Sequence, residues 1–273
     1  MKISKVWLGV GLSLLAPAAQ ETAAATRADM GLARPAPAQG GLVFVAEGGE
    51  SGEGGVTAEE ADADPLSWAT ALGVIAAHYQ AGLAAMAAGE QEAGAQMFAH
   101  GLSEIFAPMQ EVFERRGAGA VGPAMEAAVA AAAAREAGAA DKGRAVLAAL
   151  EGALAKGPQG AADPANRLAA TVEMIDRAAM QLRHAGKDEA YEAYLDGLGF
   201  ALAARDGAPA GLDWLRARDS GAADTVAAAL ALALKAYPGP RAPDQPAVAS
   251  PDMLSAASRA KAAISRHVSR GSM

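Results

Sequence analysis

The sequence contains no cysteine, and aromatic residues occupy only 4% of its 273 positions. Without cysteine the chain cannot form disulfides, perform thiol catalysis, or hold zinc or an iron–sulfur cluster through thiolates. It also lacks a block of basic residues, and its formal net charge is -8, so the clustered positive charge that binds nucleic acid is missing. We therefore expect no nucleic-acid partner.

Alanine supplies most of what the sequence does contain. Hydrophobic residues make up 52% of the chain, and more than half of them are alanines, as in the run Ala127–Ala134. Alanine is the best helix former and is depleted from strands. We predict an all-α fold, an antiparallel helical bundle, and the length allows one or two domains.

The N-terminus has the three parts of a secretory signal peptide. Lys2 and Lys5 precede a short apolar run at 6–15, and Ala16 and Ala18 are the small residues expected before a cleavage site. We predict a signal peptide at 1–18 and a periplasmic location if the source is Gram-negative. The run is shorter than the roughly 20 residues that span a bilayer, so no stable membrane span should remain after cleavage. A membrane anchor is the alternative.

Residues 19–64 lack helical periodicity and are rich in glycine, proline and glutamate. Such a composition buries too little apolar surface to offset the entropy of ordering, so we predict a flexible arm. Glu47, Glu50 and Glu53 recur every third residue between glycines and one serine. These carboxylates could collect a hard cation, or the segment could be a solvated linker.

From Pro65 onward the apolar residues have the period of a helix. Asp64 and Pro65 suit the N-cap and first position of a helix, which Gly89 should end. A second helix is predicted over 90–116, kinked or broken at Pro108 because proline removes a hydrogen-bond donor. The other predicted helices are 123–136, 141–156, 164–185, 187–205, 212–218, 224–236 and 252–267.

The second part of the chain repeats the outline of the first. Apolar residues at 146, 150 and 154 match those at 226, 230 and 234, and Gly101-Leu102 matches Gly197-Leu198. These matches have constant offsets of 80 and 96 and predict an internal duplication of helical hairpins. We expect a first half at 65–160, a second half at 164–240, a proline-rich link at 241–251 and a C-terminal helix at 252–268.

Potential metal ligands gather in the first hairpin. His78 lies eleven residues before Gly89 and His100 lies eleven after it, so a tight turn would bring them to the same level. Met97, His100 and Glu104 share one stripe of the second helix. Imidazole and carboxylate on neighbouring helices can hold iron or a similar metal, with open positions filled by water or by Glu47, Glu50 or Glu53. His184 and His267 have no such neighbours and are expected at the surface.

Other interpretations of these residues remain open. His100 and Glu104 could form a surface pair, and His78 could fill a gap in the packing. Methionines such as Met97 favour copper, although they more often fill gaps in a core. One GxGxxG string begins at Gly117, but it follows a predicted helix instead of a strand, so we interpret it as a helix connection. We expect no enzymatic activity.

The segment His100-Gly101-Leu102-Ser103-Glu104, in an exported, cysteine-free helical protein, resembles the imelysin-like iron-regulated proteins of the bacterial envelope. The motif of that family is Gly-x-His-x-x-Glu. Here no glycine lies two residues before His100, and the glutamate comes one residue later. The resemblance covers the architecture over about 65–267 and implies iron handling in the envelope.

Two functions follow from these observations. The first is an exported metal-binding protein, with iron favoured over copper, that takes His78, His100, Glu104 and Met97 as ligands, with Glu47, Glu50 and Glu53 from the arm. Its partner would be a metal-transport protein of the envelope. The second is a non-catalytic exported scaffold or adaptor that binds another protein through a face rich in alanine and glycine. A hydrolase is a third class.

Overall fold

The computed structural model describes residues 55–184 and 190–268, which all belong to one unit of the chain, 42–273. These ranges contain helices and no strand, so the predicted all-α class is confirmed. In chain order the elements are α1 (Ala58–Ala63), α2 (Pro65–Ala87), α3 (Gln91–His100), the π-helix η1 (Gly101–Phe106), the 3₁₀ turn η2 (Ala107–Met109), α4 (Gln110–Arg115), α5 (Val121–Ala133), α6 (Ala139–Leu154), α7 (Pro164–His184), α8 (Ala190–Arg216), α9 (Ser220–Ala236) and α10 (Ser250–Ile264).

Helix α2 begins where the sequence predicts it to begin. The Asp64 side chain accepts a hydrogen bond from the Ser67 backbone N–H at 2.7 Å, and Pro65 occupies the first turn. At the other end Gly89 has a φ of 90°, which glycine adopts without strain and which turns the chain into α3. The hairpin that carries His78 and His100 is therefore closed by a tight turn.

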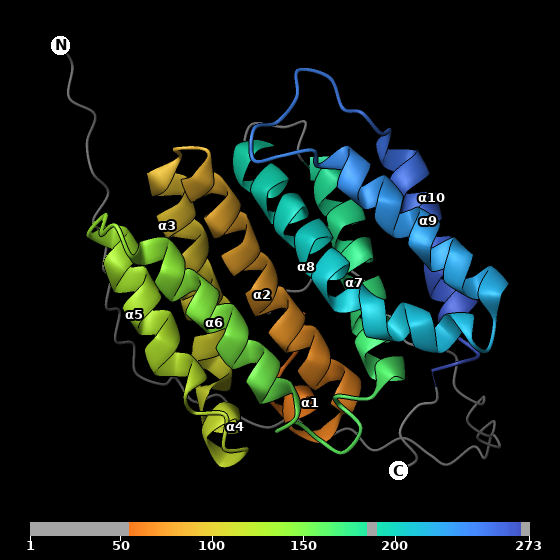
Figure 1. Cartoon of the computed structure of the whole chain (residues 1–273), viewed down its shortest axis with the longest axis horizontal. Helices are drawn as coiled ribbons and strands as arrows, with labels where there is room; N and C mark the ends of the chain where they lie inside the picture. Colours follow the sequence, from red (N-terminus) through yellow and green to blue (C-terminus); the bar gives the residue numbers. More distant parts are fainter. Residues whose placement is uncertain (1–54, 185–189, 269–273) are drawn as a thin grey trace, which may run out of the picture. The chain divides into compact units, whose positions relative to one another are not determined.

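The helices form two sets of four with the same pattern of contacts. In the first set α2 packs on α3, α3 on α5, α5 on α6, and α6 returns to α2. In the second set α7 packs on α8, α8 on α9, α9 on α10, and α10 returns to α7 (Figure 1). Helix α2 also contacts α7 and α8 and so joins the two sets.

This pattern bears on the predicted duplication. The offset of 96 relates the start of η1 to a part of α8, and these segments occupy the second position of their sets. The offset of 80 relates α6, the fourth helix of its set, to α9, the third helix of the other. Only the offset of 96 relates helices in equivalent positions of the two sets. The duplication itself stays a prediction.

Each set has one proline within a segment that continues its second helix. Pro108 lies in η2, after α3, and Pro209 lies inside α8, and the two prolines have opposite effects. Before Pro108 the α-helix gives way to the π-helix η1 and the 3₁₀ turn η2, so the predicted break is confirmed. Helix α8 runs unbroken through Pro209, so the prediction of separate helices at 187–205 and 212–218 is wrong. A Cβ on Gly211 would lie 2.7 Å from the Leu168 Cβ, so α8 is pressed against α7 just beyond the proline. This packing holds the helix together.

The last part of the arm predicted over 19–64 is a helix and not a flexible segment. Thr57 and Glu60 form a capping box that starts α1, in which each side chain binds the other's backbone N–H. Ala61 is fully buried, and Asp62 pairs with Arg115 and Arg116. The sequence analysis missed this capping box, and the rest of the arm up to residue 54 lies outside the described residues.

The core depends on a few large side chains set among alanines. Trp68 is fully buried, its Nε1 donates to the Ala153 carbonyl at 3.2 Å, and its ring lies 4.8 Å from that of Phe113. A Cβ on Gly157 would lie 2.2 Å from the Trp68 ring, so glycine is required at that position. Across the two described ranges, no helix combines the length and the apolar character needed to span a bilayer.

Candidate functional site

His78 is buried in α2, where its side chain is 2% exposed. Its Nδ1 lies 2.9 Å from the carbonyl oxygen of Val74. A carbonyl oxygen only accepts hydrogen bonds, so Nδ1 carries the proton and the neutral ring presents a lone pair on Nε2. That Nε2 is buried and makes no hydrogen bond. A buried imidazole nitrogen without a hydrogen bond is rare enough in folded proteins to need an explanation.

The Nε2 atom faces a carboxylate that the sequence analysis did not select. Oδ1 of Asp196, on α8, lies 3.9 Å from it, and Asp196 is only 5% exposed. This distance is too long for a hydrogen bond. An acidic residue within the apolar stretch Tyr194–Phe200 was the available signal in the sequence, because a carboxylate is almost never fully buried unless it has a partner.

His100 ends α3 beside His78. A Cβ on the next residue, Gly101, would lie 3.3 Å from the His78 Cβ, so the two histidine positions lie at the same level of the hairpin. The rings nevertheless pair with different carboxylates. Nδ1 of His100 lies 3.3 Å from Oε1 of Glu192, which is one turn before Asp196 on α8. This second pair is more open to solvent, with His100 27% and Glu192 56% exposed.

The other predicted ligands lie elsewhere. Glu104 is exposed in the π-helix η1, and no hydrogen bond or ion pair joins it to either histidine in the described ranges. Met97 is 2% exposed in the core. Glu104 does not join the histidines because it lies in η1. The wider turn of this π-helix changes the direction of every side chain after His100. Glu47, Glu50 and Glu53 lie outside the described residues.

The predicted ligand set is therefore not gathered within the part of the chain that the structure describes. Among those residues, no group of three or more His, Asp or Glu side chains is arranged to hold a metal ion. On the helices α2, α3 and α8 the described residues form two separate imidazole–carboxylate pairs, one buried and one partly exposed.

The surroundings of His78 favour its neutral form. Burial lowers the pKa of the imidazole, and the nearby charges of His100 and Arg177 lower it further, against an opposite effect of the Val74 carbonyl. The rings of His78 and Phe200 meet edge-on, with their centres 6.4 Å apart, and the Arg177 guanidinium carbon lies 5.9 Å from the centre of the Phe200 ring. The neutral imidazole is the form that ligates a metal ion.

Arg177 also marks where the described chain begins. A Cβ on Gly55, the first described residue, would lie 3.1 Å from a terminal nitrogen of Arg177. The described chain therefore begins beside Arg177, whose charge also lowers the pKa of His78, and the three glutamates of the arm come directly before this point in the sequence.

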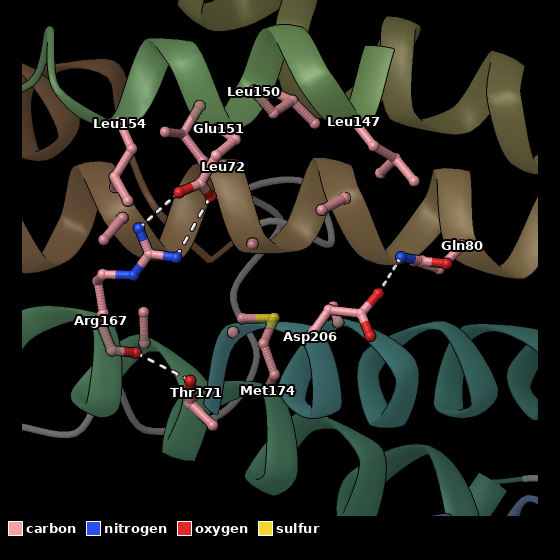
Figure 2. Close-up of a pocket in the computed structure, with 16 residues that line it drawn as sticks. Leu72, Gln80, Leu147, Leu150, Glu151, Leu154, Arg167, Thr171, Met174 and Asp206 are labelled. Carbon is pink, nitrogen blue, oxygen red and sulfur yellow. Dashed lines mark hydrogen bonds and ion pairs between the residues drawn. The ribbon is translucent and has the colours of Figure 1, made fainter. Parts of the chain in front are cut away.

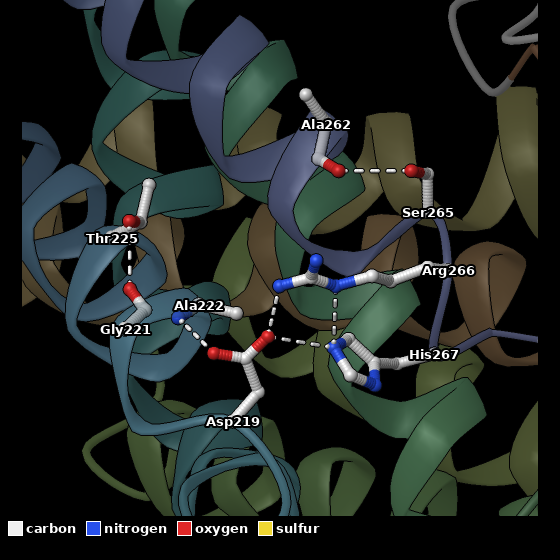
Figure 3. A network of polar contacts seen from close by, with 8 residues as sticks. All are labelled: Asp219, Gly221, Ala222, Thr225, Ala262, Ser265, Arg266 and His267. Atoms are coloured by element: carbon white, nitrogen blue, oxygen red, sulfur yellow. Dashed lines mark hydrogen bonds and ion pairs between the residues drawn. The ribbon is translucent and has the colours of Figure 1, made fainter.

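A second histidine–aspartate pair lies at the surface, where the sequence analysis expected an isolated histidine. Asp219 caps α9 by accepting from the Ala222 N–H at 3.0 Å. Its other oxygen contacts Arg266 and lies 3.1 Å from Nε2 of His267, as Figure 3 shows. These hydrogen bonds, first that of Ala222 and then those of His267 and Arg266, lower the pKa of Asp219 to about 2. This cluster ties the end of α10 to the start of α9.

Comparisons with protein-family models, with curated proteins and with solved structures found no match for this chain. The resemblance to imelysin-like proteins therefore stays a prediction from the sequence, based on the segment around His100 and on the helical architecture. The function has to be argued from the geometry of the buried pair.

Proposed function

We propose that this is an exported, non-catalytic protein that binds a transition-metal ion, and that His78 and Asp196 form the centre of the site. The single observation that supports this is the Nε2 of His78, which is buried, makes no hydrogen bond and faces a carboxylate oxygen at 3.9 Å. Metal ions hold nitrogen and oxygen ligands at about 2.0–2.2 Å, so one ion between the two atoms spans this separation.

Two ligands from the described residues leave positions to fill. Glu47, Glu50 and Glu53 precede Gly55 in the sequence, and Gly55 lies beside Arg177, whose charge lowers the pKa of His78. We assign the remaining positions to these carboxylates and to water. The pair His100–Glu192, one turn away along α8, is the place where an ion would first meet imidazole and carboxylate from solvent.

The mixture of ligands favours iron over copper. Imidazole suits iron, copper and zinc, whereas carboxylate suits harder ions and thioether favours Cu(I). Met97 lies in the core, and the chain has no cysteine, so the soft ligands that select Cu(I) are missing from the proposed set. The role that follows is capture of iron in the periplasm and its transfer to an envelope partner.

The test is a titration of the metal-free mature protein, residues 19–273, with Fe(II) under anaerobic conditions, followed by calorimetry. We expect one equivalent to bind, His78→Gln to abolish binding, and Asp196→Asn to weaken it by at least about tenfold, the scale of lost metal-site partners. His184→Gln is the matched control, because His184 is an exposed histidine that belongs to neither histidine–carboxylate pair.

A further variant tests the contribution of the arm. Replacing Glu47, Glu50 and Glu53 together by glutamine should weaken iron binding without changing the far-UV circular dichroism. Wild-type protein that takes up no iron, or a His78→Gln variant that binds as well as wild type, would contradict the proposal and favour the scaffold or adaptor function.

A further inference from the structure

A groove lies where the two sets of helices meet, away from both histidines. It has a volume of about 290 Å³ and is lined by residues of α2, α6, α7 and α8. The small residues Gly73, Ala76, Ala170, Ala203 and Gly207 leave the space open from three of these helices. Leucines 147, 150 and 154 of α6 line it from the fourth, and Figure 2 shows them extending toward α2.

The polar side chains at the groove are already paired. At one end Arg167 donates two hydrogen bonds to Glu151, at 2.7 and 3.3 Å. At the other end Gln80 donates to Asp206 at 2.5 Å, and Arg205 pairs with the same carboxylate at 2.7 Å. Figure 2 shows the Arg167–Glu151 contact toward one end of the drawn pocket and the Gln80–Asp206 contact toward the other. Each charge at the groove is therefore compensated by one of opposite sign.

We propose that this groove binds a small uncharged molecule whose body is apolar. The small size follows from the volume, which lies at the lower end of the roughly 300–1,000 Å³ that small-molecule pockets occupy. The apolar character follows from the lining, and pockets of this kind are where proteins hold small ligands. A charged ligand would lose its hydration and find only carboxylates and guanidinium groups that are already paired.

This site is independent of the metal site, because neither His78 nor Asp196 lines the groove. The His78→Gln variant should therefore bind the ligand as wild type does. Failure of the metal proposal and failure of this proposal are then distinguishable in the same set of proteins.

The experiment uses three probes with the same ten-carbon chain, namely 1-decanol, decanoate and decylamine. Binding to the metal-free protein is measured by calorimetry and by the shift of the thermal unfolding midpoint. We expect decanol to bind at least tenfold more tightly than either charged probe. Decanoate or decylamine binding as tightly as decanol overturns the claim of an uncharged ligand, and no binding by any probe overturns the site.

Filling the groove tests its location. Ala76→Leu places a larger side chain in the open space, and Ala87→Leu, at an exposed position of the same helix, is the control. We expect decanol affinity to fall at least tenfold in the first and to stay unchanged in the second. Ala203→Leu, from α8, provides a second filling variant if Ala76→Leu does not fold.

The alternative occupant of the groove is a second copy of the chain, and the same variants test this alternative. If wild-type protein elutes as a dimer in gel filtration and Ala76→Leu elutes as a monomer, the groove is an interface between copies and the proposal is wrong. If both elute as monomers, the groove is available to the small molecule.

Discussion

Two histidine–aspartate pairs within the described residues have surroundings that differ in every respect that matters for their chemistry. His78 and Asp196 lie in the interior, between α2 and α8, at 3.9 Å and without a hydrogen bond between them. His267 and Asp219 lie near the surface, between α10 and α9, at 3.1 Å and together with Arg266. The same two residue types therefore serve different purposes.

The difference shows what burial does to a polar pair. At the surface, water and three donors stabilise the Asp219 carboxylate, and its pKa falls. In the interior, removal from water disfavours the charged imidazole, and the pKa of His78 falls for that reason. The surface pair therefore holds two helix ends together, whereas burial keeps the imidazole of the interior pair neutral.

The largest expected difference between the pairs is in stability. His78→Ala removes a side chain that fills the packing between α2 and α8, and we expect a loss of about 2–4 kcal/mol in the free energy of unfolding. His267→Ala removes a half-buried side chain from a surface cluster and should cost much less. Guanidinium unfolding followed by circular dichroism measures both. Equal losses would show that the contrast in burial has no energetic consequence.

An intermediate effect is expected in the dependence of stability on pH. The pKa of His78 is lower in the folded state than the ordinary histidine value of 6.5, so the unfolded state binds more protons between these two values. The stability that results from keeping His78 neutral is fully present above pH 6.5. It is lost as the pH falls from there toward the pKa of His78 in the folded state. Asp196, His100 and Arg177 are the charged groups that face this ring.

The matched variants for this prediction are His78→Gln and His267→Gln. Unfolding free energies measured over pH 5–7, the range where histidine titrates, should lose their slope in the first variant and keep it in the second. If the dependence of the unfolding free energy on pH persists in His78→Gln, another titrating group causes it.

The smallest effect is expected at Asp219. Asparagine caps a helix as well as aspartate does, so Asp219→Asn retains the cap and loses only the charge shared by Arg266 and His267. The contribution of the wild-type carboxylate is present above its ordinary pKa of 3.8 and is lost as the pH falls through about 2. The variant should therefore be slightly less stable at neutral pH and match wild type in strong acid. An undiminished difference in strong acid would refute this assignment.

The helical fold could be predicted from local signals. Alanine content and apolar periodicity indicated helices, and Asp64, Pro65 and Gly89 located the first hairpin. Pro209 misled the prediction, because whether a helix survives a proline depends on the packing around it. Gly211 against Leu168 supplies that packing, and it cannot be inferred from the sequence near the proline.

The candidate site was predictable only in part. The positions of His78 and His100 on either side of Gly89 placed both at one level, which the contact of Gly101 with His78 supports. Their carboxylate partners, Asp196 and Glu192, belong to a helix of the other set. Which helix packs against a hairpin is decided by tertiary contacts, so no spacing within the hairpin could indicate these residues.

The π-helix η1 has a consequence for the spacing of the residues that follow His100. Its last turn closes with a bond from the Ala107 N–H to the Leu102 carbonyl, five residues earlier, so it carries one residue more than an α-helix would. Deleting one residue between Gly101 and Glu104 would restore an ordinary turn and put the glutamate three positions after His100, the spacing of Gly-x-His-x-x-Glu. Comparison of this segment with an uninterrupted α-helix therefore requires a one-residue gap after His100.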